Sequence, residues 1–186
     1  MRKLWIIFIC LLVCTGCSSQ IELQKQTFTI ELGKDVYANP ALYVKEDKNY
    51  DTSNMSVQAV SSGIRKMDNR FITGGMDYLV VGEYDFKIVD GDKEYPFKIK
   101  IKDTQPPTVN NAPTEISVAR ETIIDWSQYF DASDLSGVSY SVNQNFSTAQ
   151  AGSVDIVLKI SDRYGNAVEK KLYCEYYLER VLWTLM

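Results

Sequence analysis

The chain has 186 residues, with 20 Lys and Arg against 24 Asp and Glu, no histidine and a formal net charge of −4. Because histidine is absent, the sequence excludes Ser-His-Asp and Cys-His catalytic arrangements and leaves few ligands for a zinc site. The acidic balance, without clustered Lys or Arg, argues against nucleic acid as a partner, since phosphate binding needs such a cluster.

The first 16 residues have the composition of a secretory signal peptide. Arg2 and Lys3 precede an apolar run over residues 4–13, which is shorter than the about 20 residues needed to span a bilayer. The segment Cys14-Thr15-Gly16-Cys17 resembles a bacterial lipobox, although Cys14 stands where Leu is usual. This resemblance implies that Cys17 is acylated, becomes the first mature residue and holds an extracytoplasmic protein on the cell membrane. The alternative is an ordinary signal peptide that is cut nearby.

The mature chain is expected to be more acidic and to lack disulfides. Removal of Arg2 and Lys3 lowers the 20 basic residues to 18, against 24 acidic ones. Cys174 is then the only cysteine besides Cys17, so no intrachain disulfide is expected. We interpret Cys174 as a strand residue, because no histidine is present to activate it as a nucleophile.

Short alternating runs of apolar and polar residues dominate the rest of the chain and predict antiparallel sheets with one buried face. The clearest runs cover residues 28–32, 84–88, 97–101 and 116–118. The one candidate helix lies around 55–64.

Two parts of the chain align with each other. Residues 30–35 match 116–121 at an offset of 86, which also pairs Asn39 with Asp125, whereas 81–86 match 151–156 at an offset of 70. The offsets differ by 16, so the first copy should carry an insertion at about 45–75, expected as a peripheral helix or hairpin and a candidate binding surface. We therefore predict an all-β protein with two tandem β-sandwich modules. The predicted order is signal peptide 1–16, tether 17–25, first module 26–104, second module 105–175 and apolar tail 176–186.

The second copy carries the motifs of a known family. These are Asp103-Thr104-Gln105-Pro106-Pro107, Ala132-Ser133-Asp134-Leu135-Ser136-Gly137-Val138 and Asp162-Arg163-Tyr164-Gly165-Asn166. Over residues 103–175 the chain resembles the bacterial immunoglobulin-like (Ig-like) modules of cell-surface and crystal-toxin-like proteins. The resemblance implies Ig-like sandwiches displayed outside the cell, and it implies no single activity.

Two sets of residues are candidates for ligand binding. Oxygen-rich loops supply candidate calcium ligands, although none has the EF-hand spacing and Asp also favours turns for its local hydrogen bonds. These candidates are Asp90, Asp92, Asp131, Asp134 and Asp162. The aromatic residues Trp126, Tyr129 and Phe130 are either core residues or a platform on which a sugar ring stacks.

The sequence favours a non-catalytic protein without a cofactor, acting as a binding, adhesion or spacer element at the cell surface. Its expected partners are the membrane, through the lipid anchor, and a cell-wall polymer or another surface protein. The alternative is a carbohydrate- or peptidoglycan-binding accessory of an envelope enzyme, and an enzyme in its own right ranks third.

Overall fold

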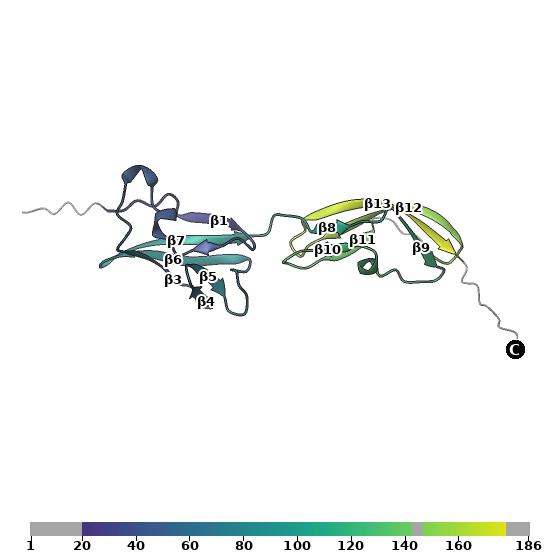
Figure 1. Cartoon of the computed structure of the whole chain (residues 1–186), viewed down its shortest axis with the longest axis horizontal. Coiled ribbons are helices and arrows are strands. Elements are labelled where there is room, and N and C mark those ends of the chain that lie inside the picture. The colour runs from purple at the N-terminus through teal and green to yellow at the C-terminus, as the bar shows by residue number, and fades with distance from the viewer. Residues whose placement is uncertain (1–19, 143–146, 178–186) are drawn as a thin grey trace, which may run out of the picture.

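The computed structural model describes residues 20–142 and 147–177, and this part of the chain is almost entirely β (Figure 1). Its helical elements are the short 3₁₀ turns η1 (Pro40–Leu42), η2 (Glu46–Lys48) and η3 (Trp126–Gln128). The all-β prediction is confirmed. Within these residues no helix has the length and apolar character that a membrane crossing requires.

The first half of the chain packs two sheets around one core. A four-stranded sheet has the order β1 (Thr27–Glu31), β7 (Lys93–Lys102), β6 (Gly82–Asp90) and β3 (Met55–Ala59). A three-stranded sheet has the order β2 (Val36–Tyr37), β5 (Arg70–Thr73) and β4 (Ile64–Met67). Alternation buries every second side chain of β6 and β7, so Phe86 and Phe97 stack inside the core.

The second half repeats the larger sheet of this plan. Its larger sheet has the order β11 (Ser139–Val142), β12 (Gly152–Ser161), β13 (Ala167–Tyr177) and β9 (Glu115–Ala119). Its smaller sheet pairs β10 (Asp131–Ser133) with β8 (Thr108–Asn111). Cys174 lies in the core between them, fully buried, and burial raises the pKa of its thiol. We refer to the two halves as the first and second modules.

Strand pairing corrects the predicted alignment of the modules by two residues. Gly82 and Gly152 pair with Ile101 and Tyr176, which therefore correspond. The parallel neighbour of Ile101 is Ile30, whereas that of Tyr176 is Val118. Ile30 thus corresponds to Val118 and not to the predicted Ile116. A two-residue slip keeps every side chain on its own face, so the apolar pattern could not reveal it.

The surplus residues of the first module lie later than predicted. Val57 on β3 pairs with Ile88 as Val142 on β11 pairs with Leu158, so β3 has a counterpart, and residues 55–59 form a strand where a helix was a candidate. The extra length falls between β3 and β6, as the hairpin β4–β5. This hairpin is not peripheral: Phe71 is 3% exposed, and its ring meets Phe86 at a centroid distance of 5.0 Å.

Candidate functional site

The linker between the modules, residues 103–107, is held from both sides. The backbone N–H and the hydroxyl of Thr104 donate hydrogen bonds of 2.7 Å to the two carboxylate oxygens of Glu31, at the end of β1. On the other side, the amide of Asn166 donates to the carbonyl oxygen of Asp103 at 3.1 Å. These contacts join the modules end to end, with β7 running into the linker (Figure 1).

Two further features concern this junction between the modules, which we call the seam. The pKa of Glu31 lies below its ordinary value, chiefly because the backbone N–H and then the hydroxyl of Thr104 bind the charged form. Gly33, in the turn after β1, has a φ of +78°, and a Cβ placed there would lie 2.5 Å from Cδ1 of Leu135 in the second module. A side chain at position 33 would therefore require Leu135 to move, and the positive φ favours glycine in any case.

Three carboxylates of different segments converge beside the linker. Asp103 comes from the linker itself, Asp134 from the loop after β10 and Asp162 from the loop between β12 and β13. One carboxylate oxygen from each lies within 4.8 Å of the other two. The sequence separated these residues by about 30 positions, and the sandwich topology brings their loops to the same end of the second module.

Local hydrogen bonds explain why two of these aspartates stand where they do. Asp134 accepts from the backbone N–H and the hydroxyl of Ser136 at 2.7 and 2.8 Å. Asp162 accepts from the backbone N–H groups of Tyr164 and Asn166 at 2.8 and 2.9 Å. These are Asx-type turns, which hold the loops in shape. Burial acts to raise the pKa of Asp162, but the hydrogen bonds from Asn166 and Tyr164 outweigh it and the pKa is lowered.

The cluster has uncompensated negative charge. Within the described residues, none of the three carboxylates forms an ion pair. Oδ2 of Asp103 is buried and accepts no hydrogen bond in this part of the chain. A cavity of about 440 Å³ opens beside the cluster, lined by Asp103 and Asp134 together with Glu31, Lys34 and Leu135. An oxygen-lined, negatively charged site is chemically suited to a hard cation.

The remaining predicted calcium candidates do not join this cluster. Asp90 and Asp92 flank the turn between β6 and β7, and β7 separates this turn from the linker. Asp131 is exposed on β10. Asp103 was missed as a ligand because its position in the Asp103-x-x-Pro-Pro motif marks a module boundary. That motif was the signal that could have identified it.

The predicted aromatic platform is divided by the fold. Phe130 is 1% exposed and belongs to the second core, so it is not available for stacking on a ligand. Trp126 and Tyr129 are half-buried and pack against the same core around η3. The predicted lipidation site, Cys17, lies outside the described residues.

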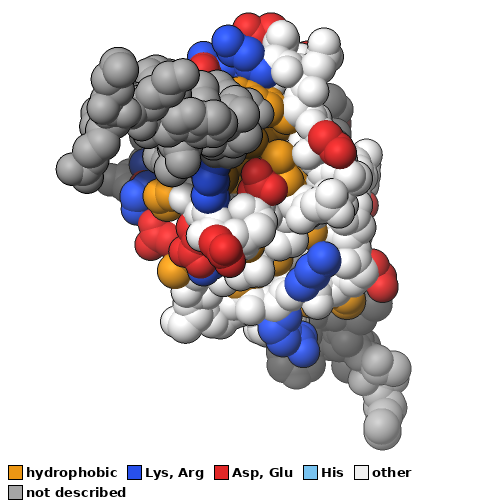
Figure 2. Space-filling view, turned by 90° about the vertical axis from the view of Figure 1, so that its left-hand side faces the viewer, with side chains coloured by type: hydrophobic (Ala, Val, Ile, Leu, Met, Phe, Trp, Pro, Cys, Tyr) orange, Lys and Arg blue, Asp and Glu red, His pale blue; other side chains and the backbone are white. Residues whose placement is uncertain are grey.

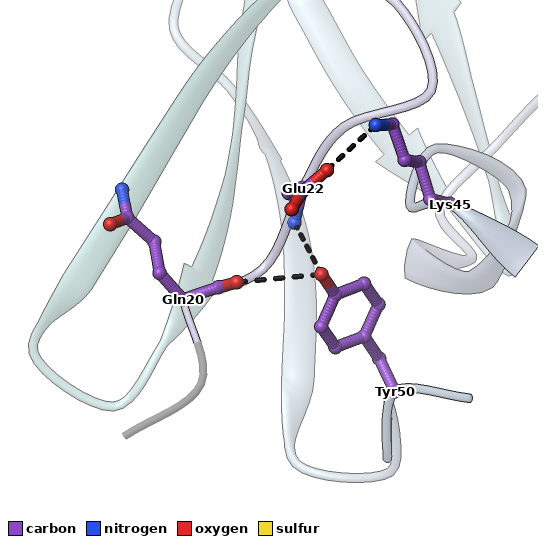
Figure 3. A network of polar contacts seen from close by, with 4 residues as sticks. All are labelled: Gln20, Glu22, Lys45 and Tyr50. Carbon is purple, nitrogen blue, oxygen red and sulfur yellow. Dashed lines mark hydrogen bonds and ion pairs between the residues drawn. The ribbon is translucent and has the colours of Figure 1, made fainter. Parts of the chain in front are cut away.

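The corresponding end of the first module is built differently (Figure 3). The hydroxyl of Tyr50 accepts from the backbone N–H of Glu22 at 3.0 Å and donates to the carbonyl oxygen of Gln20. Lys45 forms an ion pair with Glu22 at 2.6 Å. Figure 2 shows acidic and basic side chains interspersed on this end of the molecule, without a patch of one sign among the residues drawn in colour.

Comparisons with known proteins give low similarity only. No protein family and no curated protein matches the chain. Among solved structures, human mucin-like protocadherin EC1-2 is 11% identical, over 86% of this chain and 98% of that one, with a TM-score of 0.31. Human protocadherin-24 EC1-2 is 11% identical, over 86% of this chain and 97% of that one, with a TM-score of 0.32. Chicken VE-cadherin EC1-2 is 13% identical, over 84% of this chain and 100% of that one, with a TM-score of 0.30. Similarity at this level carries no argument about function.

Proposed function

We propose that this chain is a non-catalytic, lipid-anchored cell-surface protein whose two Ig-like modules form a rod that acts as a binding, adhesion or spacer element. Cys17 would carry the acyl chains, and the modules would extend from the membrane into the space outside it. A cell-wall polymer or another surface protein is the expected partner.

The seam is the observation that supports a rod. The contact between Glu31 and Thr104 fixes the linker to the first module, and that between Asn166 and Asp103 fixes it to the second. Pro106 and Pro107 stiffen the remaining linker and prevent it from becoming helical. A linker restrained on both sides holds one module at a set distance from the other, which a freely jointed pair does not do.

The anchor is tested by cell fractionation. Cys17→Ala should move the protein from the membrane fraction into the medium or leave an uncleaved precursor, whereas the control Ser18→Ala should remain in the membrane fraction. Detergent-phase partitioning of Cys17→Ala equal to that of the unmodified chain would refute the anchor.

The rod is tested by small-angle X-ray scattering of the chain released from the membrane. Wild type should give one extended shape, and Glu31→Ala, which removes both bonds to Thr104, should give a broader distribution with a shorter mean length. Glu115→Ala, at an exposed position on β9, is the matched control. A wild-type profile that fits only a freely jointed pair would contradict a spacer role.

The carbohydrate-binding alternative is favoured by a different observation. Tyr173 and Tyr177 lie on the outward face of β13 and are 41% and 48% exposed, so part of each side chain is open to solvent on one side of a sheet. Aromatic rings in this setting can stack on sugars. This function is tested by cosedimentation of wild type and of a Tyr173→Ser/Tyr177→Ser variant with purified peptidoglycan. Binding that uses these rings should be lost in the variant, whereas non-specific binding should be unchanged.

A further inference from the structure

We propose that Asp103, Asp134 and Asp162 form a calcium site that fixes the linker to the second module. The proposal concerns metal binding and does not depend on the partner or the membrane anchor of the protein. It is carried by the geometry of the three carboxylates and by the buried oxygen of Asp103.

The size of the cluster suits calcium. Calcium binds oxygen at 2.3–2.6 Å, so two ligands of one ion are at most about 5 Å apart, whereas two ligands of magnesium, at 2.0–2.1 Å, are at most about 4 Å apart. The three carboxylate oxygens lie within 4.8 Å of one another. This spread is within the span of two ligands of one calcium ion, and calcium, unlike magnesium, does not require a near-ideal octahedral arrangement of its ligands.

The ligand chemistry points the same way. Carboxylate oxygens are the ligands that calcium prefers, and water from the adjoining cavity can complete a coordination number of six to eight. The cavity also presents Glu31, which adds negative charge, and Lys34, which is the one cationic side chain among its lining residues. The cavity therefore has one cationic side chain, Lys34, against the three carboxylates of Glu31, Asp103 and Asp134.

The buried oxygen of Asp103 is an independent indication of a ligand. A buried carboxylate oxygen without a hydrogen bond is costly to desolvate, and native proteins pair nearly all such atoms. Oδ2 of Asp103 has no such partner among the described residues, while Asp134 and Asp162 are satisfied by their turns. A cation would supply the missing interaction and would offset the repulsion between the three charges.

The position of Asp103 gives the site its mechanical role. Asp103 precedes Thr104, which is bonded to the first module, and the other two ligands belong to the second module. Metal binding would add a strong link between the linker and the second module to the single hydrogen bond from Asn166. Calcium would thereby set how rigid the seam is.

Calcium binding is tested on the full chain, purified in detergent with chelator and then dialysed. We expect calcium chloride to bind with one site per chain and a Kd of about 10⁻⁴ to 10⁻³ M, the range of extracellular modules. It should also raise the melting temperature and slow proteolysis at residues 104–108. Magnesium chloride at the same concentration should have a smaller effect.

Three variants separate a ligand role from a structural role. Asp103→Asn and Asp134→Asn keep the side-chain shape and should weaken calcium binding roughly tenfold or more, since charge count tunes affinity. In chelator, Asp103→Asn should be at least as stable as wild type because it removes repulsion; a purely structural Asp103 would instead lose stability in both conditions. Asp131→Asn is the matched control and should bind as wild type does.

Four results would overturn the proposal. They are the absence of calcium binding by wild type at 10 mM, an equal response to magnesium, an equal loss of binding in Asp131→Asn, and lower stability of Asp103→Asn in chelator.

Discussion

The two modules share a plan of strands but differ at the same end. In the first module this end is closed by the Tyr50 hydroxyl and the Lys45–Glu22 ion pair, so the carboxylate of Glu22 is paired with a cation. In the second module the same end holds three aspartates without an ion pair in the described residues. The comparison teaches that the sandwich conserves its strands while the loops at its ends decide what each module can bind.

A second difference lies on the side of the first module. Hairpin β4–β5 forms the smaller sheet together with β2 and covers the core with Phe71, whereas among the described residues of the second module no strand lies between β11 and β12. The first module therefore depends on a segment that its neighbour does without.

Deleting the hairpin should have the largest effect. Removal of residues 61–78 takes away Phe71 and Ile72, both 3% exposed, and exposes Phe86, so the first module should no longer melt cooperatively. Differential scanning calorimetry should retain the transition of the second module. A variant that keeps both transitions would show that the hairpin is peripheral, as the sequence alignment alone suggested.

Matched core truncations should test whether the modules unfold separately. Phe86 and Ile156 occupy corresponding, buried positions on β6 and β12. Phe86→Ala should cost about 3–5 kcal/mol and Ile156→Ala about 2–5 kcal/mol of the free energy of unfolding of its own module. Chemical denaturation followed by NMR signals from each module measures this. If either change lowers the stability of both modules equally, they form one cooperative unit.

Matched cap variants should have smaller effects. Asn39 accepts from the N–H of Ala41 at 3.1 Å, and Asp125 accepts from that of Ser127 at 3.1 Å, so each caps a short 3₁₀ turn. Asn39→Ala and Asp125→Ala should each cost about 0.5–2 kcal/mol. Urea unfolding gives both values. Asp125 also accepts from the Ser127 hydroxyl, so a smaller loss at Asp125 than at Asn39 would contradict this account of the caps.

Loss of the Glu31 contacts on acidification should have the smallest effect. The pKa of Glu31 is lower in the folded state because Thr104 binds its charged form. The stabilisation of the seam by the Glu31 carboxylate is therefore complete above the ordinary Glu pKa of about 4.3, and it is lost as the pH falls through the lower pKa of the folded state. Scattering profiles should broaden below about pH 4 in wild type, while Glu31→Gln should already be broad at pH 7. A seam that is unchanged at pH 3 would show that other contacts hold it.

The sequence predicted the strands and the repeat because apolar and polar residues alternate along a strand whose sheet has one buried face. It also aligned Asn39 with Asp125, and the structure shows that each caps a short 3₁₀ turn. It did not predict the register of β1, because a slip of two residues leaves the pattern unchanged. It gave Asp134 and Asp162 as calcium candidates in separate loops and omitted Asp103, because only the three-dimensional arrangement brings the loops of one sandwich end together.

The parallel pairing of β1 with β7 determines how the first module bears tension. The chain enters at the start of β1 and leaves at the end of β7, so a pull along the rod draws these neighbouring strands in opposite directions. The ladder from Thr27–Lys98 to Glu31–Lys102 is then loaded in shear, and its hydrogen bonds must break together instead of one after another. In the second module the chain enters through β8, which pairs antiparallel with β10, before it reaches the parallel ladder of β9 with β13. A protein tethered at one end and bound at the other would resist detachment through the ladder of β1 with β7.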